Sequence, residues 1–400
     1  MKIDRSQEVD LFSQPVPEPI STGILPSQTL ASFVDAGKII SPEPILGDQI
    51  QPASIDLRLG KVAYQVRASF LPGNCAVDSK IRDLLIRKVD LTEPAVFAAN
   101  SVFIVPLVES LALPRDVSGK ANPKSTIGRL DIFTRLITDL GHEFEWIPKG
   151  YTGALYLEIV SRTFPIVVKA GMKLNQLRLV KGNPPSNDSV LTRLAEREIL
   201  VYEDNDGPIT PQIQRGLSVS VDLQGNGSKI IAYRAKKNAP PVDLSKRDYY
   251  DVEDYWEIIH TPRAKELILQ PHEFYIMASW ERIGVPPSHA AEMVAFDPSF
   301  GEFRVHYAGF FDPGFGHGVG GTKAVLEVRA HEVPILLVDR QQVGKLVYHK
   351  MAQRPEKVYG ASIGSSYQKQ GLTLSKQFAR ESYGDIADAT ADGPMLVPLI

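Results

Sequence analysis

One short stretch of the chain combines the residue types that bind phosphate. It contains Lys124, Ser125, Thr126, Gly128 and Arg129. The two cations supply positive charge, the hydroxyl groups donate hydrogen bonds, and the glycine lets a phosphate approach the backbone closely. The stretch therefore indicates an anion-binding site, with a solvent-exposed turn as the alternative.

A second candidate stretch, Ala308–Gly316, lies in the C-terminal part of the chain. Asp312-Pro313-Gly314 is a strong turn signal, and the aromatic residues around it are suited to stacking on a base. The pattern predicts a strand, a hairpin tip at Asp312 and a second strand. The alternative is that Asp312 serves only the turn.

Two glutamates follow apolar, β-type runs. Glu327 lies within Ala324–Val328, and Glu158 lies in a similar setting. A carboxylate on a mostly buried strand needs a partner, or the loss of water raises its pKa. A carboxyl group with a raised pKa is suited to general acid and base catalysis. A glutamate that faces solvent is the alternative.

The elements that must position these residues are predicted to be mainly β. The chain has 400 residues, which is too many for one typical core, and its 30 Gly and 30 Pro separate short runs of β-type residues. Predicted strands include Ser101–Val108, Gly153–Val160, Phe274–Ala278 and Ala324–Val328. Ser27–Ala36 and Asp188–Glu198 are the two helical patterns.

The chain also contains an internal repeat, which indicates two copies of one domain. Glu158–Pro165 aligns with Glu327–Pro334, and Ser54–Leu57 aligns with Ser220–Leu223 upstream. The predicted boundaries are an extended leader over residues 1–22, a first domain over 23–202, a linker over 203–208, a second domain over 209–371 and a C-terminal tail over 372–400. Within the second domain, 359–371 is rich in Gly and Ser, as in an arm that orders over a ligand or in a flexible tail.

The two copies differ at the candidate residues. At the place of Lys124–Arg129, the second copy has Phe296–Phe300, which contains no cation and carries an aspartate. At the place of Asp312, the first copy has Pro148. Each copy has therefore lost residues that the other keeps.

Composition and motifs exclude several functional classes. Lys+Arg of 44 against Asp+Glu of 47 gives a net charge of −3, unlike a general nucleic-acid binder. The apolar runs are too short for a membrane span, and the N-terminus lacks a signal-peptide core, so we expect a cytoplasmic protein. Cys75 is the only cysteine, which excludes a zinc-dependent deaminase site. Gly360–Gly364 matches a serine-hydrolase motif, but no histidine follows His349.

Together these residues resemble the dCTP deaminase branch of the dUTPase-like superfamily, in the double-length form of some bacteria. The matching motifs are, in chain order, Pro52–Gly60, Lys124–Arg129, Ala308–Gly316, Val325–Glu327 and Tyr359–Gly371. The resemblance implies a mainly β chain of two tandem dUTPase-like β-barrel domains, of the distorted jelly-roll type, with a few short helices.

The resemblance also implies a zinc-free hydrolytic deamination of dCTP to dUTP and ammonia. Carried over to this chain, the catalytic residues are Glu327, Ser125 and Arg129, with Glu158 as second choice for the glutamate. The implied substrate-binding residues are Lys124, Thr126, Gly128, Ala308, Asp312, Val325, Tyr359, Tyr367, Lys369 and Gln370. No side chain is expected to bind a metal directly, because Mg²⁺ is expected to arrive with the triphosphate.

Such sites lie between subunits, so the division of residues between the copies predicts one composite site per pair of domains. On the phosphate side of this site, two residues differ from the family's pattern. Lys124 replaces an arginine and loses bidentate geometry, and Ser366 stands where the family's arm has a lysine, for which Lys369 is a candidate replacement.

Two other functions share these features. A dUTPase, or a bifunctional dCTP deaminase and dUTP diphosphatase, uses the same fold and pocket, and a non-enzymatic sensor would bind a dNTP without turnover. The expected partners are dCTP and dUTP, without a nucleic-acid polymer or a membrane, and a homo-oligomer is compatible with the fold.

Overall fold

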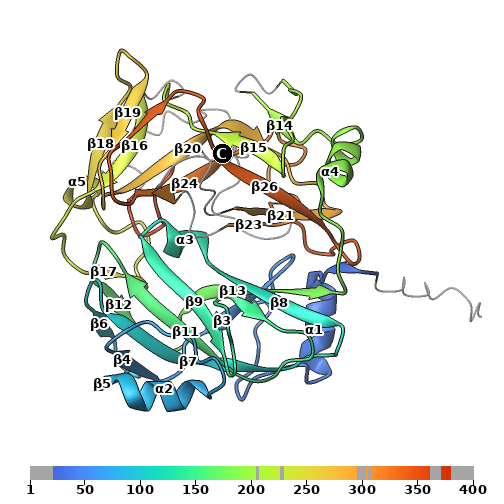
Figure 1. Cartoon of the computed structure of the whole chain (residues 1–400), viewed down its shortest axis with the longest axis vertical. Helices are drawn as coiled ribbons and strands as arrows, with labels where there is room; N and C mark the ends of the chain where they lie inside the picture. Colours follow the sequence, from blue (N-terminus) through green and yellow to red (C-terminus); the bar gives the residue numbers. More distant parts are fainter. Residues whose placement is uncertain are drawn as a thin grey trace, which may run out of the picture.

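The chain forms two β-rich lobes (Figure 1). The computed structural model describes residues 21–203, 207–225, 229–294, 309–360 and 371–379, with the backbone of residues 303–304 in addition. We call residues 21–183 the first half, which is the lower lobe in Figure 1, and residues 187–379 the second half. The described chain is mainly β with few helices, as the sequence predicts.

The helices of the described residues are short. They are α1 (Ser27–Asp35), α2 (Val77–Leu84), α3 (Ser125–Gly128), α4 (Asp188–Ala195) and α5 (Val252–Tyr255). The strands of the first half are β1 (Gly23–Ile24), β2 (Ile39–Ile40), β3 (Ile55–Arg58), β4 (Val62–Val66), β5 (Leu85–Asp90), β6 (Ala95–Phe97), β7 (Val102–Ala112), β8 (Val117–Pro123), β9 (Ile132–Thr138), β10 (Trp146–Ile147), β11 (Thr152–Ser161), β12 (Ile166–Val168) and β13 (Lys173–Lys181). Those of the second half are β14 (Val201–Tyr202), β15 (Leu217–Ser220), β16 (Ile230–Ala235), β17 (Val242–Asp243), β18 (Trp256–His260), β19 (Glu266–Leu269), β20 (Phe274–Ile283), β21 (His289–Met293), β22 (Phe303–Arg304), β23 (Phe310–Phe311), β24 (Thr322–Ala330), β25 (Ile335–Val338) and β26 (Gln342–Lys350).

The strand order of the first half recurs in the second. One sheet runs β5-β4-β7-β11-β9 in the first half and β18-β16-β20-β24-β22 in the second. A facing set, β3, β13, β8 and β10, has its counterpart in β15-β26-β21-β23. Glu158 pairs with Ile104, as Glu327 pairs with Ile276, so the two glutamates occupy equivalent places. The repeat in the sequence is therefore a repeat of strand pairing.

The predicted strands are present, but the helices were predicted incompletely. α1 matches its predicted range within one residue, and α4 begins at Asp188 as predicted but ends at Ala195. α2 was missed because its N-terminus is capped from a distance, by the Asp139 side chain, which accepts a hydrogen bond from Val77 N (2.7 Å). The short α3 and α5 were missed as well.

The predicted hairpin with its tip at Asp312 is wrong. β23 pairs with β21, whereas β24 belongs to the other sheet. The chain between them turns repeatedly through glycines with positive φ, namely Gly314, Gly316, Gly318, Gly320 and Gly321. Backbone bonds from Val285 to Phe315 and from Gly314 to Val285 hold this loop, so Asp312 begins a connection between two sheets.

Residues that precede the predicted linker at 203–208 pack with the second half. β14 pairs with β20, and Leu191, Leu200 and Val201 are buried in the core of the second half. At the other end, Leu374 and Phe378 are buried although the tail was predicted to begin at 372. Residues 1–20 of the predicted leader, 204–206 of the linker and 380–400 of the tail lie outside the described residues.

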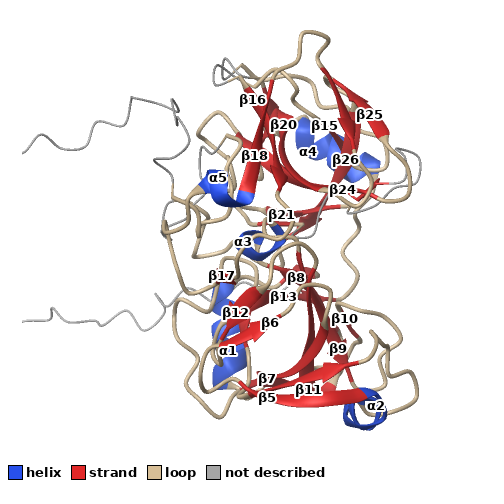
Figure 2. Ribbon diagram, turned by 90° about the vertical axis from the view of Figure 1, so that its left-hand side faces the viewer, coloured by secondary structure: helices blue, strands red, loops and turns tan. Residues whose placement is uncertain are grey.

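One hydrophobic core is shared between the halves. The ring of Phe164 in the first half contacts Tyr255 and Trp256 of the second, with centroids 5.7 and 5.5 Å apart. β17 of the second half extends the β12–β6 sheet of the first in parallel fashion. Figure 2 shows α3 between the two lobes, which places the phosphate-binding candidate at this junction.

A buried ion pair also links the halves. Arg329 Nη2 donates to Asp131 Oδ2 and to Thr163 Oγ1 (3.0 Å), and Thr163 Oγ1 donates to the same aspartate oxygen (2.6 Å). Asp131 is fully buried and Arg329 nearly so. While the halves stay packed together, loss of either charge would leave the other buried without its counter-charge.

We therefore expect Asp131→Asn to destabilise the protein by about 3–5 kcal/mol, because Arg329 then stays buried without its counter-charge. Asparagine tolerates the positive φ of this position (60°), so backbone strain is not introduced. Urea unfolding provides the measurement. The control is Asp116→Asn, whose pair with Lys181 is long (3.8 Å) and largely exposed, so a loss below about 1 kcal/mol is expected. Equal losses in the two variants would contradict this assignment.

Candidate functional site

The phosphate-binding candidate is a single helical turn that directly follows β8. Lys124 is extended (φ −69°, ψ 145°) and precedes the turn, and its carbonyl accepts from Ile127 N (2.8 Å) and Gly128 N (3.0 Å). Ile127 is buried in the shared core. One apolar residue thus anchors the turn, while Lys124, Ser125 and Thr126 stay partly exposed. We call residues 124–129 the phosphate-binding turn, after the role for which they are candidates.

Glu327 of the second half lies directly against this turn of the first. A Cβ atom added to Gly128 would lie 2.6 Å from Glu327 Oε1 and 2.7 Å from Oε2. Glu327 is 1% exposed, on β24, which lies between β20 and β22 in its sheet. The structure therefore brings together two candidates that the sequence had assigned to different copies, and it explains the glycine by the space that the carboxylate needs.

We expect Gly128→Ala to fold but to lose activity. The backbone here is right-handed helical, so alanine itself is tolerated, and the atoms it meets are the end of a flexible side chain. The displaced carboxylate should cost about 100-fold in kcat/KM for the chain's enzymatic reaction, because shifts of an ångström have that effect.

The matched control for this substitution is Gly47→Ala, since nothing lies within 4 Å of a Cβ added there. Steady-state kinetics and thermal unfolding together provide the measurement. Full activity in Gly128→Ala would show that the contact with Glu327 is unimportant.

Lys124 forms an ion pair with Asp56 of β3. Asp56 is 1% exposed, and its Oδ1 atom has no hydrogen-bond partner among the described residues. Burial raises the pKa of Asp56, and the Lys124 ammonium opposes that shift. The motif Pro52–Gly60 thus contributes a buried carboxylate behind the phosphate-binding turn.

Arg129 is buried and contacts the C-terminal segment. Its Nη1 atom donates to Thr373 O (3.0 Å) and to Leu374 O (3.5 Å). Ser375 Oγ donates to Thr126 O (2.7 Å). The residues after the predicted arm therefore pack on the turn that carries the phosphate-binding candidates.

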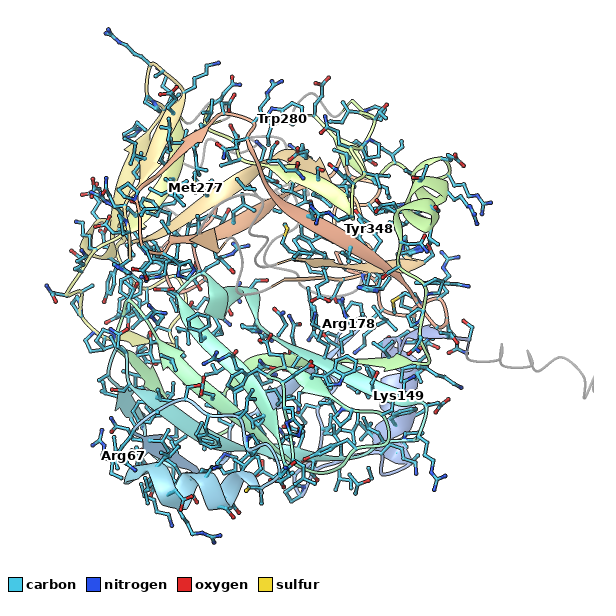
Figure 3. The ribbon with its side chains drawn as sticks, viewed as in Figure 1. Arg67, Lys149, Arg178, Met277, Trp280 and Tyr348 are labelled. Carbon is cyan, nitrogen blue, oxygen red and sulfur yellow. The ribbon has the colours of Figure 1, made fainter. Side chains whose placement is uncertain are left out.

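Asp312 forms a buried ion pair with Arg178, a residue that the sequence analysis missed. Arg178 Nη2 lies 3.2 Å from Asp312 Oδ1, and the guanidinium stacks on Phe310 with its carbon 4.0 Å from the ring centroid. Figure 3 shows Arg178 at the junction of the two lobes. The only signal in the sequence was a cation between the apolar residues Leu177 and Leu179.

The ion pair sets the electrostatics of Asp312. Burial raises the pKa of this carboxyl, and the Arg178 guanidinium opposes the shift. Weaker effects come from Asp56, which raises the pKa, and from Lys124, which lowers it. Asp312 therefore lies within electrostatic reach of the phosphate-binding turn, on the opposite side of the interface between the halves.

Other contacts fix the same interface. Asn122 Oδ1 accepts from Gly309 N (2.7 Å), and Lys120 pairs with Glu292. Both first-half residues lie on β8, just before the phosphate-binding turn.

Two of the remaining candidates lie among the described residues, and four lie outside them. Val325 is buried in the shared core on β24, two residues before Glu327. Tyr359 packs on Phe315 of the glycine-rich loop, with ring centroids 5.6 Å apart, and its N–H donates to Pro313 O (2.9 Å). The candidates that lie outside the described residues are Ala308, Tyr367, Lys369 and Gln370.

Glu158 has a different environment from Glu327. It is fully buried and accepts from Arg135 Nε (2.8 Å) and Nη2. Arg135 in turn stacks on Phe144, with its guanidinium carbon 4.1 Å from the ring centroid. The Arg135 guanidinium thus occupies Glu158 Oε1 with two hydrogen bonds, which argues against this second-choice residue.

The described residues show two features that concern metals and membranes. No group of three or more His, Cys, Asp or Glu side chains is arranged to hold a metal ion. No helix in that part of the chain has both the length and the apolar character to cross a membrane.

Comparisons with known proteins identify relatives of both halves of the chain. Residues 21–183 match the model of the 2'-deoxycytidine 5'-triphosphate deaminase N-terminal domain, and residues 187–378 match that of its C-terminal domain. A "dCTP deaminase, dUMP-forming" of Nanoarchaeum equitans is 32% identical over 183 residues, 41% of this chain and 87% of the relative. A "dCTP deaminase" of Halorubrum lacusprofundi is 28% identical over 189 residues, 46% of this chain and 86% of the relative.

A solved structure extends the likeness over both halves. The crystal structure of 2'-deoxycytidine 5'-triphosphate deaminase from Agrobacterium tumefaciens is similar with a TM-score of 0.78 and 51% identity, covering 83% of this chain and 99% of that one. The chain thus belongs to the dCTP deaminase family.

Proposed function

We propose that the chain hydrolyses dCTP to dUTP and ammonia at one site formed between its two halves. The contact of the Glu327 carboxylate with Gly128 carries this proposal, because it joins the glutamate of one copy to the phosphate-binding turn of the other. The first half lacks an aspartate at Pro148, and its own glutamate is paired with Arg135. These differences favour one functional site over two.

In the proposed reaction, Glu327 is the general base and acid. It accepts, one after the other, the two protons of a water molecule whose oxygen attacks C4 of cytosine. It delivers one proton to N3 of the ring and the other to the amino group that leaves as ammonia, so that C4 becomes a carbonyl group. Ser125 and Arg129 position the water and offset the developing charge. Ala308, Asp312 and Val325 recognise the base and sugar, with Arg178 as a positioning residue that orients Asp312.

The triphosphate lies on the other side of the proposed site. Lys124, Thr126 and Gly128 bind it, together with Tyr359, Tyr367, Lys369 and Gln370 from the arm. Mg²⁺ enters with the nucleotide and neutralises phosphate charge, and the proposal requires no zinc and no protein ligand to the metal.

The finer architecture is part of the proposal. We infer that each half is a dUTPase-like barrel of the distorted jelly-roll type, with residues 187–202 assigned to the second. The recurring strand order supports this assignment. The two covalently linked halves of this chain then correspond to two neighbouring subunits in an assembly of single-domain chains.

A second candidate activity continues to dUMP. The name of the Nanoarchaeum equitans relative carries "dUMP-forming", as does that of a relative from Acidothermus cellulolyticus, 28% identical over 165 residues. In that reaction the triphosphate is hydrolysed after the base is deaminated. The remaining alternatives are a dUTPase and a sensor that binds a dNTP without turnover.

Incubation of the protein with dCTP and Mg²⁺ separates these functions. We expect dUTP and ammonia in equal amounts, because the proposed site activates water toward C4 of the base. Chromatography of the nucleotides with an ammonia assay provides the measurement. dUMP would establish the bifunctional reaction, turnover of dUTP alone a dUTPase, and bound but unchanged dCTP a sensor.

We expect Glu327→Gln to lose about 10²–10⁴-fold in kcat, since the amide cannot accept the proton of water. Glu158→Gln is the matched variant on the equivalent strand position and should keep its kcat. Thermal unfolding checks that both variants fold. Loss of turnover in Glu158→Gln with full turnover in Glu327→Gln would reverse the assignment.

A further inference from the structure

The C-terminal segment 371–379 lies on the phosphate-binding turn and is attached to it by side chains from both partners. Ser375 Oγ donates to Thr126 O (2.7 Å), and Arg129 Nη1 donates to Thr373 O (3.0 Å). Ser375 is 2% exposed and Arg129 is 3% exposed, so both bonds are shielded from water. The segment is therefore part of the site's wall.

The residue after Ser375 is fixed by its neighbours. Asp248 N donates to Lys376 O (2.8 Å), and Gln377 Nε2 donates to Leu244 O (3.2 Å). The ring of Phe378 packs on Tyr255 and Trp256 in the shared core. The backbone of Lys376 is thus held on both sides, and its half-buried side chain has a restricted reach.

Lys376 lies among other cations. Burial lowers the pKa of its ammonium, the positive charges of Lys124, Arg247 and Lys173 lower it further, and Asp56 opposes them. Lys376 directly follows Ser375, whose hydroxyl group donates to Thr126 O, so Lys376 lies beside the turn that Lys124 precedes.

The other cations of this cluster each have a carboxylate. These pairs are Lys124 with Asp56, Lys173 with Asp48 (2.7 Å) and Arg247 with Asp248 (3.4 Å). Among the described residues, Lys376 has no carboxylate partner. A half-buried ammonium beside like charges is costly unless an anion joins it, so an anionic ligand at this place would be stabilised by Lys376.

We propose that Lys376 is a substrate-binding residue that contacts the triphosphate of the nucleotide from the C-terminal segment. It supplies the cation that Ser366, at the family's lysine position, does not. The inference rests on the proposed function for the identity of the nucleotide, but its binding chemistry, a lysine ammonium with a polyphosphate, can be tested without turnover.

The test compares Lys376→Met, Lys376→Arg and the control Lys61→Met, an exposed lysine away from the site, in the full chain. Isothermal titration calorimetry measures the Kd of inorganic tripolyphosphate and of deoxycytidine, and kinetics gives KM and kcat for dCTP. Lys376→Met should raise the Kd of tripolyphosphate and the KM of dCTP about tenfold, as expected for one lost charged hydrogen bond. The Kd of deoxycytidine and kcat should stay constant, Lys376→Arg should recover most of the loss, and Lys61→Met should match the wild type.

An unchanged tripolyphosphate Kd in Lys376→Met would overturn the inference, as would an equal loss of deoxycytidine binding, which indicates a structural role. The proposed function fails separately. If the wild type does not turn over dCTP while tripolyphosphate binding depends on Lys376, the deaminase assignment is wrong and the phosphate contact stands. If dCTP is deaminated and the substitution has no effect, only the role of Lys376 is wrong.

Discussion

The carboxylate of Glu327 can lie against Gly128 only while the two halves keep one fixed relation. No side chain fits between them, so small rotations of one half would either open a gap or force a clash. The buried Asp131–Arg329 and Arg178–Asp312 pairs and the shared core around Phe164 oppose such rotations. Each pair joins a residue of one half to a residue of the other, so a small displacement at the interface would weaken both ion pairs. The interface is thus the element on which the site's geometry depends.

Covalent linkage of two copies removes the requirement that each copy be complete. The first half keeps the phosphate-binding turn but holds Glu158 in an ion pair with Arg135. The second half keeps Glu327 and Asp312. The shared motif on β3 and after β15 shows the same divergence: Asp56 pairs with Lys124 of the phosphate-binding turn, whereas its counterpart Asp222 pairs with Lys323 of β24 (2.7 Å). One scaffold aspartate therefore faces the site in one copy and is a structural ion-pair partner in the other.

The charges of the site are arranged by depth. Asp56 is buried behind the turn, and the largely buried Asp312 directly follows β23, each with a cation in front of it or beside it. Lys124 and Lys376 are the cations nearer to solvent, and in the proposed site they bind the polyphosphate of the nucleotide. A buried carboxylate fixes the position of the lysine ammonium group. Because the ammonium group has three N–H donors, it can still donate hydrogen bonds to a more highly charged anion at the surface.

The sequence by itself determined the duplication, the β character and the residue types that each copy keeps. Repeats, strand periodicity and motif order are properties of the linear chain, so Glu327 and the Lys124–Arg129 turn could be named without a structure. Only the tertiary structure decided what these residues meet. Arg178 as the partner of Asp312, Asp139 as the cap of α2, the sheet-to-sheet loop after Asp312 and the pairing of Glu158 all join residues that are distant in the chain. Such contacts depend on strand register and on the position of the other half, and these leave no local pattern in the sequence.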